Sequence, residues 1–404
     1  MASVVLPAPS MPSIVIRRPR FMFVARDPTG HYDRGMLAEL ERHPHARAVL
    51  APALESGGQA SHAYLFYGPG GAGKRSAARS MAAELLAAGS PDPASARARV
   101  ASGAHPDLTW VAPSGAHEIL VSDIDGPVVS AASKTPFEAT CRVFVIERVD
   151  ELGDEAANRM LKTLEEPPSF VHLILLSDRL AEVLPTIRSR CQLVRFDAPT
   201  VEETARTLEA LGEDHETALA CAHLALGDGE RARELTGPEG QALRAAAETF
   251  ARAAISGEMA RTEPWTQVLA AVRSRGEAVR TQLEMRAHED LELYPRKERK
   301  RVETEWTERI RRARRRAETS ALDLALQVVA LWYADLASLA WGARDLVRSV
   351  DRVPELESDA RPDPQSLRAA IEAVEDTRLR FQLNVSEELA CESLAYRLEQ
   401  LLAG

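Results

Sequence analysis

The sequence lacks paired cysteines and long apolar runs, and each lack excludes a class of protein. Its four cysteines lie far apart and form no C-x-x-C pair, which excludes a disulfide framework and a zinc module. No apolar run approaches the roughly 18 residues needed to span a bilayer, and Pro7, Pro9 and Pro12 interrupt the N-terminal stretch where a signal peptide needs an apolar core. We therefore expect a cytoplasmic protein that does not contact a membrane.

The chain also lacks an excess of positive charge. The 404 residues include 50 Lys and Arg against 60 Asp and Glu, a net charge of -10. Proteins that bind nucleic acid over their whole surface carry a broad basic footprint, so any DNA contact must be local or made through partners. Residues 296–316 are the local exception, with eleven Lys or Arg and four Glu, a net of +7. They form either a solvated helical arm with ion pairs along the helix or a patch that faces phosphates.

The chain changes character along its length. Residues 1–35 hold five prolines and five arginines and predict a poorly ordered leader, or upstream sequence that is not translated if Met36 is the start. Between residues 36 and 197, helical stretches alternate with the apolar runs AYLFY, LTWVA, RVFVIE, VHLILLS and LVRF. Such runs are typical of a parallel sheet covered on both faces. Residues 198–240 predict short helices and residues 241–404 are helical almost throughout, so we expect an α/β fold followed by an all-α region.

A phosphate-binding loop follows the first apolar run. Gly68, Gly73 and Lys74 fit the pattern G-x-x-x-x-G-K-[ST], in the strand-loop-helix context that such a loop requires. Arg75 replaces the hydroxyl residue that ligates magnesium, and a guanidinium offers no lone pair to a cation. Ser76 comes one residue late and points about 100° away on a helix. The loop therefore either binds a phosphate or nucleotide without magnesium or is an empty loop kept for its turn.

The second half of an ATPase site departs from the pattern in the same way. The run Val143–Ile146 is followed by Glu147, which could hold magnesium, and then by Arg148. Arg148 occupies the position where a glutamate would activate the attacking water. Because arginine stands at two separate catalytic positions, the sequence argues against ATP hydrolysis.

Three longer strings resemble a known family. They are "AANRMLKTLEEPP" at Ala156–Pro168, "LPTIRSRCQLVRF" at Leu184–Phe196 and "NVSEELACESLAYRLEQLL" at Asn384–Leu402. They are similar to the AAA+ clamp-loader family of bacterial DNA polymerase III, and the resemblance covers about residues 37–240 and 384–402. It implies a subunit of a ring that opens a sliding clamp and loads it onto primed DNA.

The resemblance also implies a domain order and partners. We expect an AAA+ RecA-like P-loop domain at 36–197, a helical lid at 198–240 and a helical collar for oligomerisation at 241–404, with a charged arm at about 273–320. Tau/gamma and delta subunits would be its direct partners, and it would reach the sliding clamp and primer-template DNA through the assembled complex. No cofactor is required, and the interval 89–105 lacks the cysteines of the zinc module found in some members.

The family's Ser-Arg-Cys motif falls at Ser189, Arg190 and Cys191. The resemblance implies that Arg190 is an arginine finger that stabilises charge on a nucleotide bound by the neighbouring subunit. The alternative is a surface arginine in a structural ion pair. Arg188 shares this role or is solvated, Ser189 is expected in a turn and Cys191 as a small buried side chain, and Ser177 falls near the family's sensor position, with a structural role expected.

Three functions remain open on the sequence. The preferred one is a non-hydrolysing assembly subunit that donates Arg190 in trans. The second is an active ATPase motor of the same family, in which Ser76 and Glu147 restore magnesium binding. The third is an AAA+-derived interaction protein outside replication.

Overall fold

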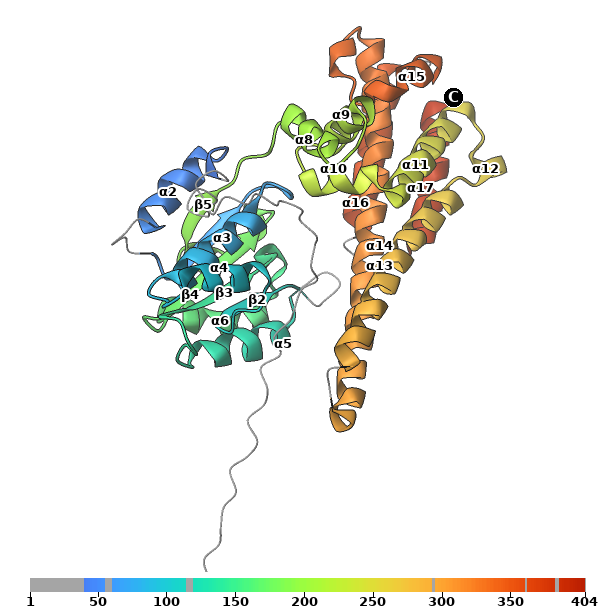
Figure 1. The fold of residues 1–404 in the computed structure, drawn as a ribbon. Coiled ribbons are helices and arrows are strands. Elements are labelled where there is room, and N and C mark those ends of the chain that lie inside the picture. Colours follow the sequence, from blue (N-terminus) through green and yellow to red (C-terminus); the bar gives the residue numbers. More distant parts are fainter. Residues whose placement is uncertain are drawn as a thin grey trace, which may run out of the picture. The chain divides into compact units, whose positions relative to one another are not determined.

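The computed structural model describes residues 40–54, 60–113, 119–292, 295–359, 362–381 and 385–403. The leader expected at residues 1–35 lies outside these ranges. The chain divides into two compact units (Figure 1). The first comprises Met1–Pro69 and Gly73–Asp197, and the second comprises Ala198–Gly404 together with the three loop residues Gly70–Ala72.

The first unit contains a five-stranded parallel sheet, which confirms the five apolar runs as strands. The strands are β1 Ala63–Tyr67, β2 Leu108–Val111, β3 Arg142–Ile146, β4 Val171–Ser177 and β5 Gln192–Arg195. Their order is β2-β3-β4-β1-β5, and all neighbours are parallel. Every crossover is therefore long enough to contain helices.

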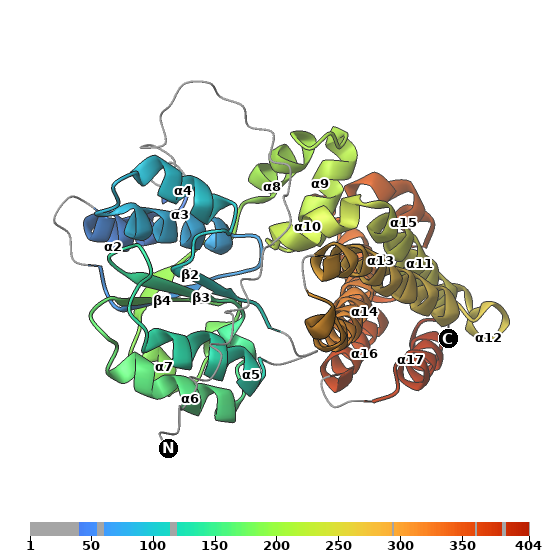
Figure 2. The same cartoon turned by 60° about the horizontal axis from the view of Figure 1, so that its bottom comes forward.

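Helices cover both faces of this sheet (Figure 2). On one face lie α2 Pro44–Leu54, α3 Lys74–Ala87 and α4 Pro93–Ala101, and on the other lie α5 Val121–Ile124, α6 Asp154–Glu165 and α7 Pro185–Arg188. The π-helix Asp125–Ser130 and the 3-10 turns Val149–Glu151 and Leu180–Glu182 complete the connections. Burial on both faces explains why β3 and β4 read as continuous apolar runs, with Phe144, Leu173 and Ile174 fully buried.

A buried carboxylate fixes a loop at the edge of the sheet. Asp107 lies just before β2 and is 1% exposed. Its two oxygens accept backbone N–H bonds from Phe137, Glu138 and Ala139 at 2.6, 2.9 and 3.0 Å. These three donors satisfy the buried carboxylate, which would otherwise lack partners for its charge. The loop before β3 is thereby tied to β2.

The described part of the second unit is entirely helical, as expected. Its α-helices are α8 Val201–Glu209, α9 His215–Leu224, α10 Gly229–Thr236, α11 Pro238–Ser256, α12 Met259–Thr262, α13 Trp265–Glu292, α14 Arg296–Ala340, α15 Val353–Asp359, α16 Pro364–Arg380 and α17 Glu387–Leu402. One apolar cluster extends from α8 to α17. The proposed division into a lid at 198–240 and a collar at 241–404 stays a prediction, because both ranges contribute to this cluster and to one compact unit.

Helix α14 supplies the centre of that cluster. Its apolar stripe is at most 1% exposed and consists of Leu322, Leu326, Val329 and Tyr333. A window within Arg299–Ala340 is long and apolar enough to cross a membrane by length and composition, so the expectation that no such stretch exists was wrong. That window is 72% buried inside the unit, and α14 packs against α11, α13 and α16. These are the properties of a core helix.

Candidate functional site

The loop after β1 has a backbone that only glycine adopts easily. Gly68 has a φ of +147°, and a Cβ there would lie 2.1 Å from the carbonyl oxygen of Phe196. Gly73 has a φ of +88° and is the N-cap of α3, which begins at Lys74. The sequence prediction of a strand, a glycine loop and a helix is thus confirmed, and the phosphate-binding role of this loop stays a prediction.

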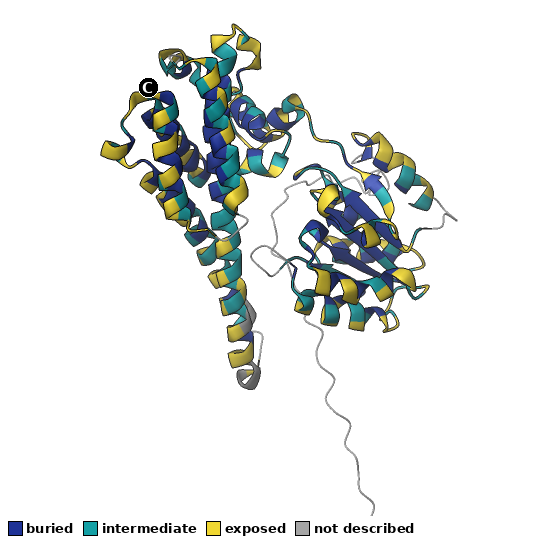
Figure 3. Cartoon of the chain, turned by 180° about the vertical axis from the view of Figure 1, so that it is seen from behind, coloured by how far each residue is buried: buried dark blue, intermediate teal, exposed yellow. Residues whose placement is uncertain are grey.

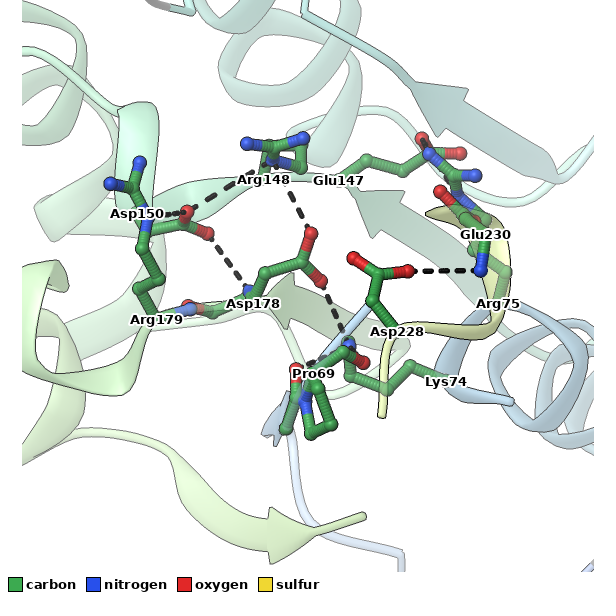
Figure 4. Close-up of polar contacts among 12 residues, drawn as sticks. Pro69, Lys74, Arg75, Glu147, Arg148, Asp150, Asp178, Arg179, Asp228 and Glu230 are labelled. Atoms are coloured by element: carbon green, nitrogen blue, oxygen red, sulfur yellow. Dashed lines mark hydrogen bonds and ion pairs between the residues drawn. The ribbon is translucent and has the colours of Figure 1, made fainter. Parts of the chain in front are cut away.

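Lys74 is bound by oxygens of its own chain (Figure 4). The residue is 6% exposed, and its Nζ donates to the carbonyl oxygens of Gly68 at 2.5 Å and Pro69 at 2.6 Å. A third contact, 2.8 Å long, joins Nζ to Oδ1 of Asp178, the residue after β4. An ammonium has three donors, so a phosphate would have to displace at least one of these oxygens.

Arg75 forms an ion pair with Glu147 (Figure 4). Its Nε and Nη2 lie 3.1 and 2.9 Å from Oε2 of Glu147. The other carboxylate oxygen, Oε1, accepts the indole N–H of Trp110 at 2.5 Å. The Arg75 side chain is 48% exposed and that of Glu147 only 4%, and Arg79 lies over the Trp110 ring at 5.0 Å.

This ion pair decides how the site fits magnesium. In a working site the hydroxyl after the lysine and the carboxylate after β3 serve the same metal ion. Here Arg75 stands at the position of the hydroxyl, and its guanidinium lies 2.9 Å from the carboxylate of Glu147. A guanidinium has no lone pair to offer a metal ion, and its positive charge repels a cation. Among the described residues, no group of three or more His, Cys, Asp or Glu could hold a metal. The residues present do not fit a magnesium ion at this site.

Arg148 sits at the position of the expected catalytic glutamate, in a left-handed backbone conformation with φ +57°. Its guanidinium lies 2.5 Å from Glu151, 3.7 Å from Asp178 and 4.0 Å from Asp150. Burial works to lower the pKa of Arg148, but the charges of these three carboxylates outweigh it and raise the pKa above its usual value. The side chain stays charged and cannot act as a base, and Asp178 links it to Lys74 (Figure 4).

Ser177 is a buried residue that supports the loop. It is 1% exposed, and its carbonyl oxygen accepts the N–H of Gly68 at 3.3 Å. Its hydroxyl accepts the N–H of Arg179 at 3.1 Å. Both contacts are structural, in keeping with the role expected for it.

The Ser-Arg-Cys motif lies at the end of α7. Ser189 is exposed, and its hydroxyl donates to the carbonyl oxygen of Thr186 at 3.1 Å. Arg190 donates to the same oxygen at 2.9 Å and pairs with Oε1 of Glu165, at the end of α6, at 2.5 Å. The Arg190 side chain keeps 35% of its surface exposed. Cys191 was expected to be buried but is only partly buried, because it precedes the edge strand β5. Burial still raises the pKa of its thiol to about 12.

The structure therefore brings some of the predicted residues together and keeps one apart. Gly68, Gly73 and Lys74 form one cluster with Asp178, whereas the contacts of Arg190 in the described part of the chain are with α6 and α7. Sequence reasoning missed Asp178 and Trp110. The available signal was their position, Asp178 after a predicted strand and Trp110 within one.

A cavity of about 940 Å³ lies elsewhere in the first unit, at the amino ends of β1 and β4. Its lining includes Tyr64, His62 and His172. The imidazole rings of His62 and His172 stack with their centroids 5.8 Å apart. The glycine loop follows the carboxyl end of β1, the end of the sheet at which ligands of open parallel sheets bind. The cavity lies at the opposite end of the strands and is therefore separate from the loop.

Comparison with known proteins points to one family. Residues 43–200 match the family described as "DNA polymerase III, delta subunit". The DNA polymerase III subunit delta' of Pseudomonas aeruginosa is 38% identical over 138 residues, 33% of this chain and 42% of the relative. The Bacillus subtilis subunit delta' is 36% identical over 160 residues, 39% of this chain and 48% of the relative. The chain thus spans less than half the length of these relatives.

Matches to other subunits are weaker. The gamma/tau subunit of Mycobacterium tuberculosis is 31% identical over 169 residues, 39% of this chain and 28% of the relative. A gamma-subunit-related protein from Thermotoga maritima aligns with 88% of this chain and 99% of its own at 16% identity, with a TM-score of 0.34.

Proposed function

We infer the function of this chain from the premise that its residues 43–200 belong to the clamp-loader family, with delta-prime subunits among their relatives. We propose that it is a delta-prime-type component of the DNA polymerase III holoenzyme that does not hydrolyse ATP itself. It would assemble in the cytoplasm with tau/gamma and delta subunits and help to load the sliding clamp onto primer-template DNA. Residues 198–240 and 241–404 would be its lid and its oligomerising collar.

The observation that carries the proposal is the Arg75–Glu147 ion pair. It fills the two positions that would share magnesium, and Arg148 holds a fixed positive charge where a general base belongs. The alternative of an active motor needs Glu147 to leave both Arg75 and Trp110 before it can hold a metal. Residual binding of a phosphate without magnesium is compatible with the proposal, because the glycine loop still leads into the N-terminus of α3.

Steady-state ATP turnover by the purified chain tests the silent state. We expect no turnover above background with or without magnesium, and no change on Lys74→Ala. Magnesium-dependent turnover that Lys74→Ala abolishes would establish an active motor instead.

The second part of the proposal is that Arg190 acts in trans on the neighbour's nucleotide. Its support is the motif and the partial exposure of the guanidinium, which is held by a single half-exposed carboxylate, Glu165. Exposed ion pairs contribute about 0–1 kcal/mol, so a phosphate on a neighbouring subunit can compete for Arg190.

A reconstituted loader with wild-type, Arg190→Ala or Arg190→Lys chains tests this role. An arginine finger raises the rate of hydrolysis at the site it serves by a factor on the order of 10³ to 10⁵. Fingers from other subunits would keep part of the total turnover and so hide part of the loss. We expect lower DNA- and clamp-stimulated turnover with both variants at equal assembly, since an ammonium cannot reproduce the planar fork. Arg159→Ala removes another exposed ion-paired arginine of the same unit and serves as control. Equal rates throughout would leave Arg190 a structural residue.

A further inference from the structure

A long two-helix hairpin projects from the second unit. Helices α13 and α14 run side by side and continue beyond the other helices of this unit (Figure 1). We name residues 273–318 the arm. They hold 15 Lys or Arg and 10 Asp or Glu, a net of +5. Because the whole chain carries -10, the remaining residues carry -15, and the arm has a charge opposite to that of the rest of the molecule.

The apolar side of the arm is used within the hairpin. Val302 on α14 and Ala287 on α13 are 6% and 8% exposed, and Ile310, two turns after Val302, is half-buried. Exposed residues follow the outer side of the arm (Figure 3), and one of them on α13 is the large apolar side chain of Met285, which is 60% exposed. The described side chains of α14 in the arm therefore offer a partner charge and hydrogen bonds, and none of the apolar ones among them is fully exposed for insertion into a membrane or for another coiled coil.

Three basic residues form a stripe on the outer side of α14. Lys300, Arg311 and Arg315 are exposed, and helical geometry places them within about 60° of one another over a length of about 22 Å. Two threonines between them on this side, Thr304 and Thr307, donate their hydroxyls to the helix's own backbone. The stripe is therefore a straight row of cations.

Carboxylates near the stripe do not cancel it. Arg311 pairs with Glu308 at 2.7 Å and is still 74% exposed, and Arg315 pairs with Glu387 at 2.9 Å and is 46% exposed. Pairs this exposed contribute about 0–1 kcal/mol and are screened by salt. Phosphates arranged in a row can replace both carboxylates, and they release condensed counterions when they do.

We propose that this stripe, Lys300, Arg311 and Arg315, binds the phosphate backbone of duplex DNA without reading its sequence. A row of phosphates matches a row of cations, whereas the described residues of α14 along the stripe include no exposed apolar side chain that a folded protein partner would bury. The choice of DNA among polyanions rests on the proposed function, since a clamp loader works on primed duplex. The contact itself is independent of ATP chemistry.

The test uses the full chain and a fluorescent 20-base-pair duplex, with anisotropy measured at several salt concentrations between about 50 and 200 mM. The variant combines Lys300→Gln, Arg311→Gln and Arg315→Gln, because glutamine keeps helix propensity. The control combines Arg261→Gln, Arg344→Gln and Arg368→Gln, three arginines of the same unit that are 71%, 63% and 82% exposed. Both variants remove the same formal charge, and circular dichroism checks that both remain helical.

Each phosphate contact contributes about 0.9 to the slope of log K against log salt. We expect the stripe variant to lower the slope by about 2 to 3 and to weaken binding at least about tenfold, and the control to change little. Unchanged binding by the stripe variant, equal losses in both variants or no binding by the wild type would each overturn the proposal. Loss of subunit assembly with DNA binding intact would assign the stripe to an acidic protein surface and would also overturn it. None of these outcomes bears on the ATPase and Arg190 measurements, which test the proposed function separately.

Discussion

Replacing Arg75 by alanine should destabilise the first unit, although the arginine is half exposed. The substitution removes the cation that pairs with Glu147, whose side chain is only 4% exposed. The carboxylate would keep the N–H of Trp110 as a donor and would lose the charge that compensates its burial. A residue that is only a relic of a lost ATPase would have no such effect.

The size of the loss follows from where the pair lies between two limits. A fully exposed pair contributes about 0–1 kcal/mol, and removal of one partner from a buried pair costs about 3–5 kcal/mol. With one partner at 48% and the other at 4% exposure, solvent screens part of the interaction, and we expect a loss of about 1–3 kcal/mol. That corresponds to a fall in Tm of roughly 3–9 °C for a unit of this size.

Hydrogen exchange in urea, followed on peptides from β1 and β3, measures the stability of the first unit without interference from the second. A double-mutant cycle combines Arg75→Ala with Glu147→Gln, which removes the buried charge. The double variant should lose less stability than the sum of the losses in the two single variants. Arg159→Ala, in a pair whose partners are 55% and 49% exposed, should change stability by no more than about 0.5 kcal/mol. A loss for Arg75→Ala no larger than that of this control would refute the reasoning.

Three further predictions concern the first unit. Gly68→Ala should destabilise it by at least about 2 kcal/mol in urea unfolding, because the new Cβ would lie 2.1 Å from a backbone oxygen at a φ of +147°, and the unit should not tolerate larger residues there. Asp107→Ala should cost about 1–3 kcal/mol by the same assay, since it removes the buried carboxylate that accepts three backbone N–H bonds from the loop before β3; a cost below about 0.5 kcal/mol would mean that water replaces the carboxylate. Burial raises the pKa of Cys141 to about 11 from an ordinary value near 9, so the thiol ionises at lower pH in the unfolded chain than in the folded one. The free energy of unfolding should therefore fall as the pH rises from about 9 to 11. Cys141→Ala should make that fall shallower.

The sequence predicts the sheet well because its strands are buried on both faces. A continuous run such as VHLILLS is typical of a strand inside a covered parallel sheet, and it appears as β4 Val171–Ser177. The glycine loop is equally predictable, since Gly68 and Gly73 need backbone angles that other residues avoid. The helical C-terminal half is correct as a class. Its long apolar stretch in α14 was underestimated, because acidic residues such as Asp323 and Asp335 break the run in sequence without preventing burial of the helix.

The contacts of the site could not be predicted from the sequence. Lys74 and Asp178 are more than a hundred positions apart and meet only because β1 and β4 are neighbours in the sheet. Arg75 was identified as a lost ligand, yet its pairing with Glu147 depends on how α3 packs over β3. From the sequence, Arg190 could be either an arginine finger or a surface arginine in a structural ion pair. Its partner Glu165 lies within the "LEEPP" part of the string at Ala156–Pro168, and no local sequence pattern marks this glutamate as an ion-pair partner.

Helix α14 gives the second unit a mechanical property as well as a surface. It runs for 45 residues from Arg296 to Ala340, about 68 Å at the rise of an α-helix, and contains neither glycine nor proline at which it could bend sharply. Its first half belongs to the arm and its second half is the centre of the apolar core. The helix is therefore a stiff lever, and a sideways force on the arm reaches the core as torque. A ligand that tilts the arm must either repack α11 and α16 around α14 or turn the whole unit with it.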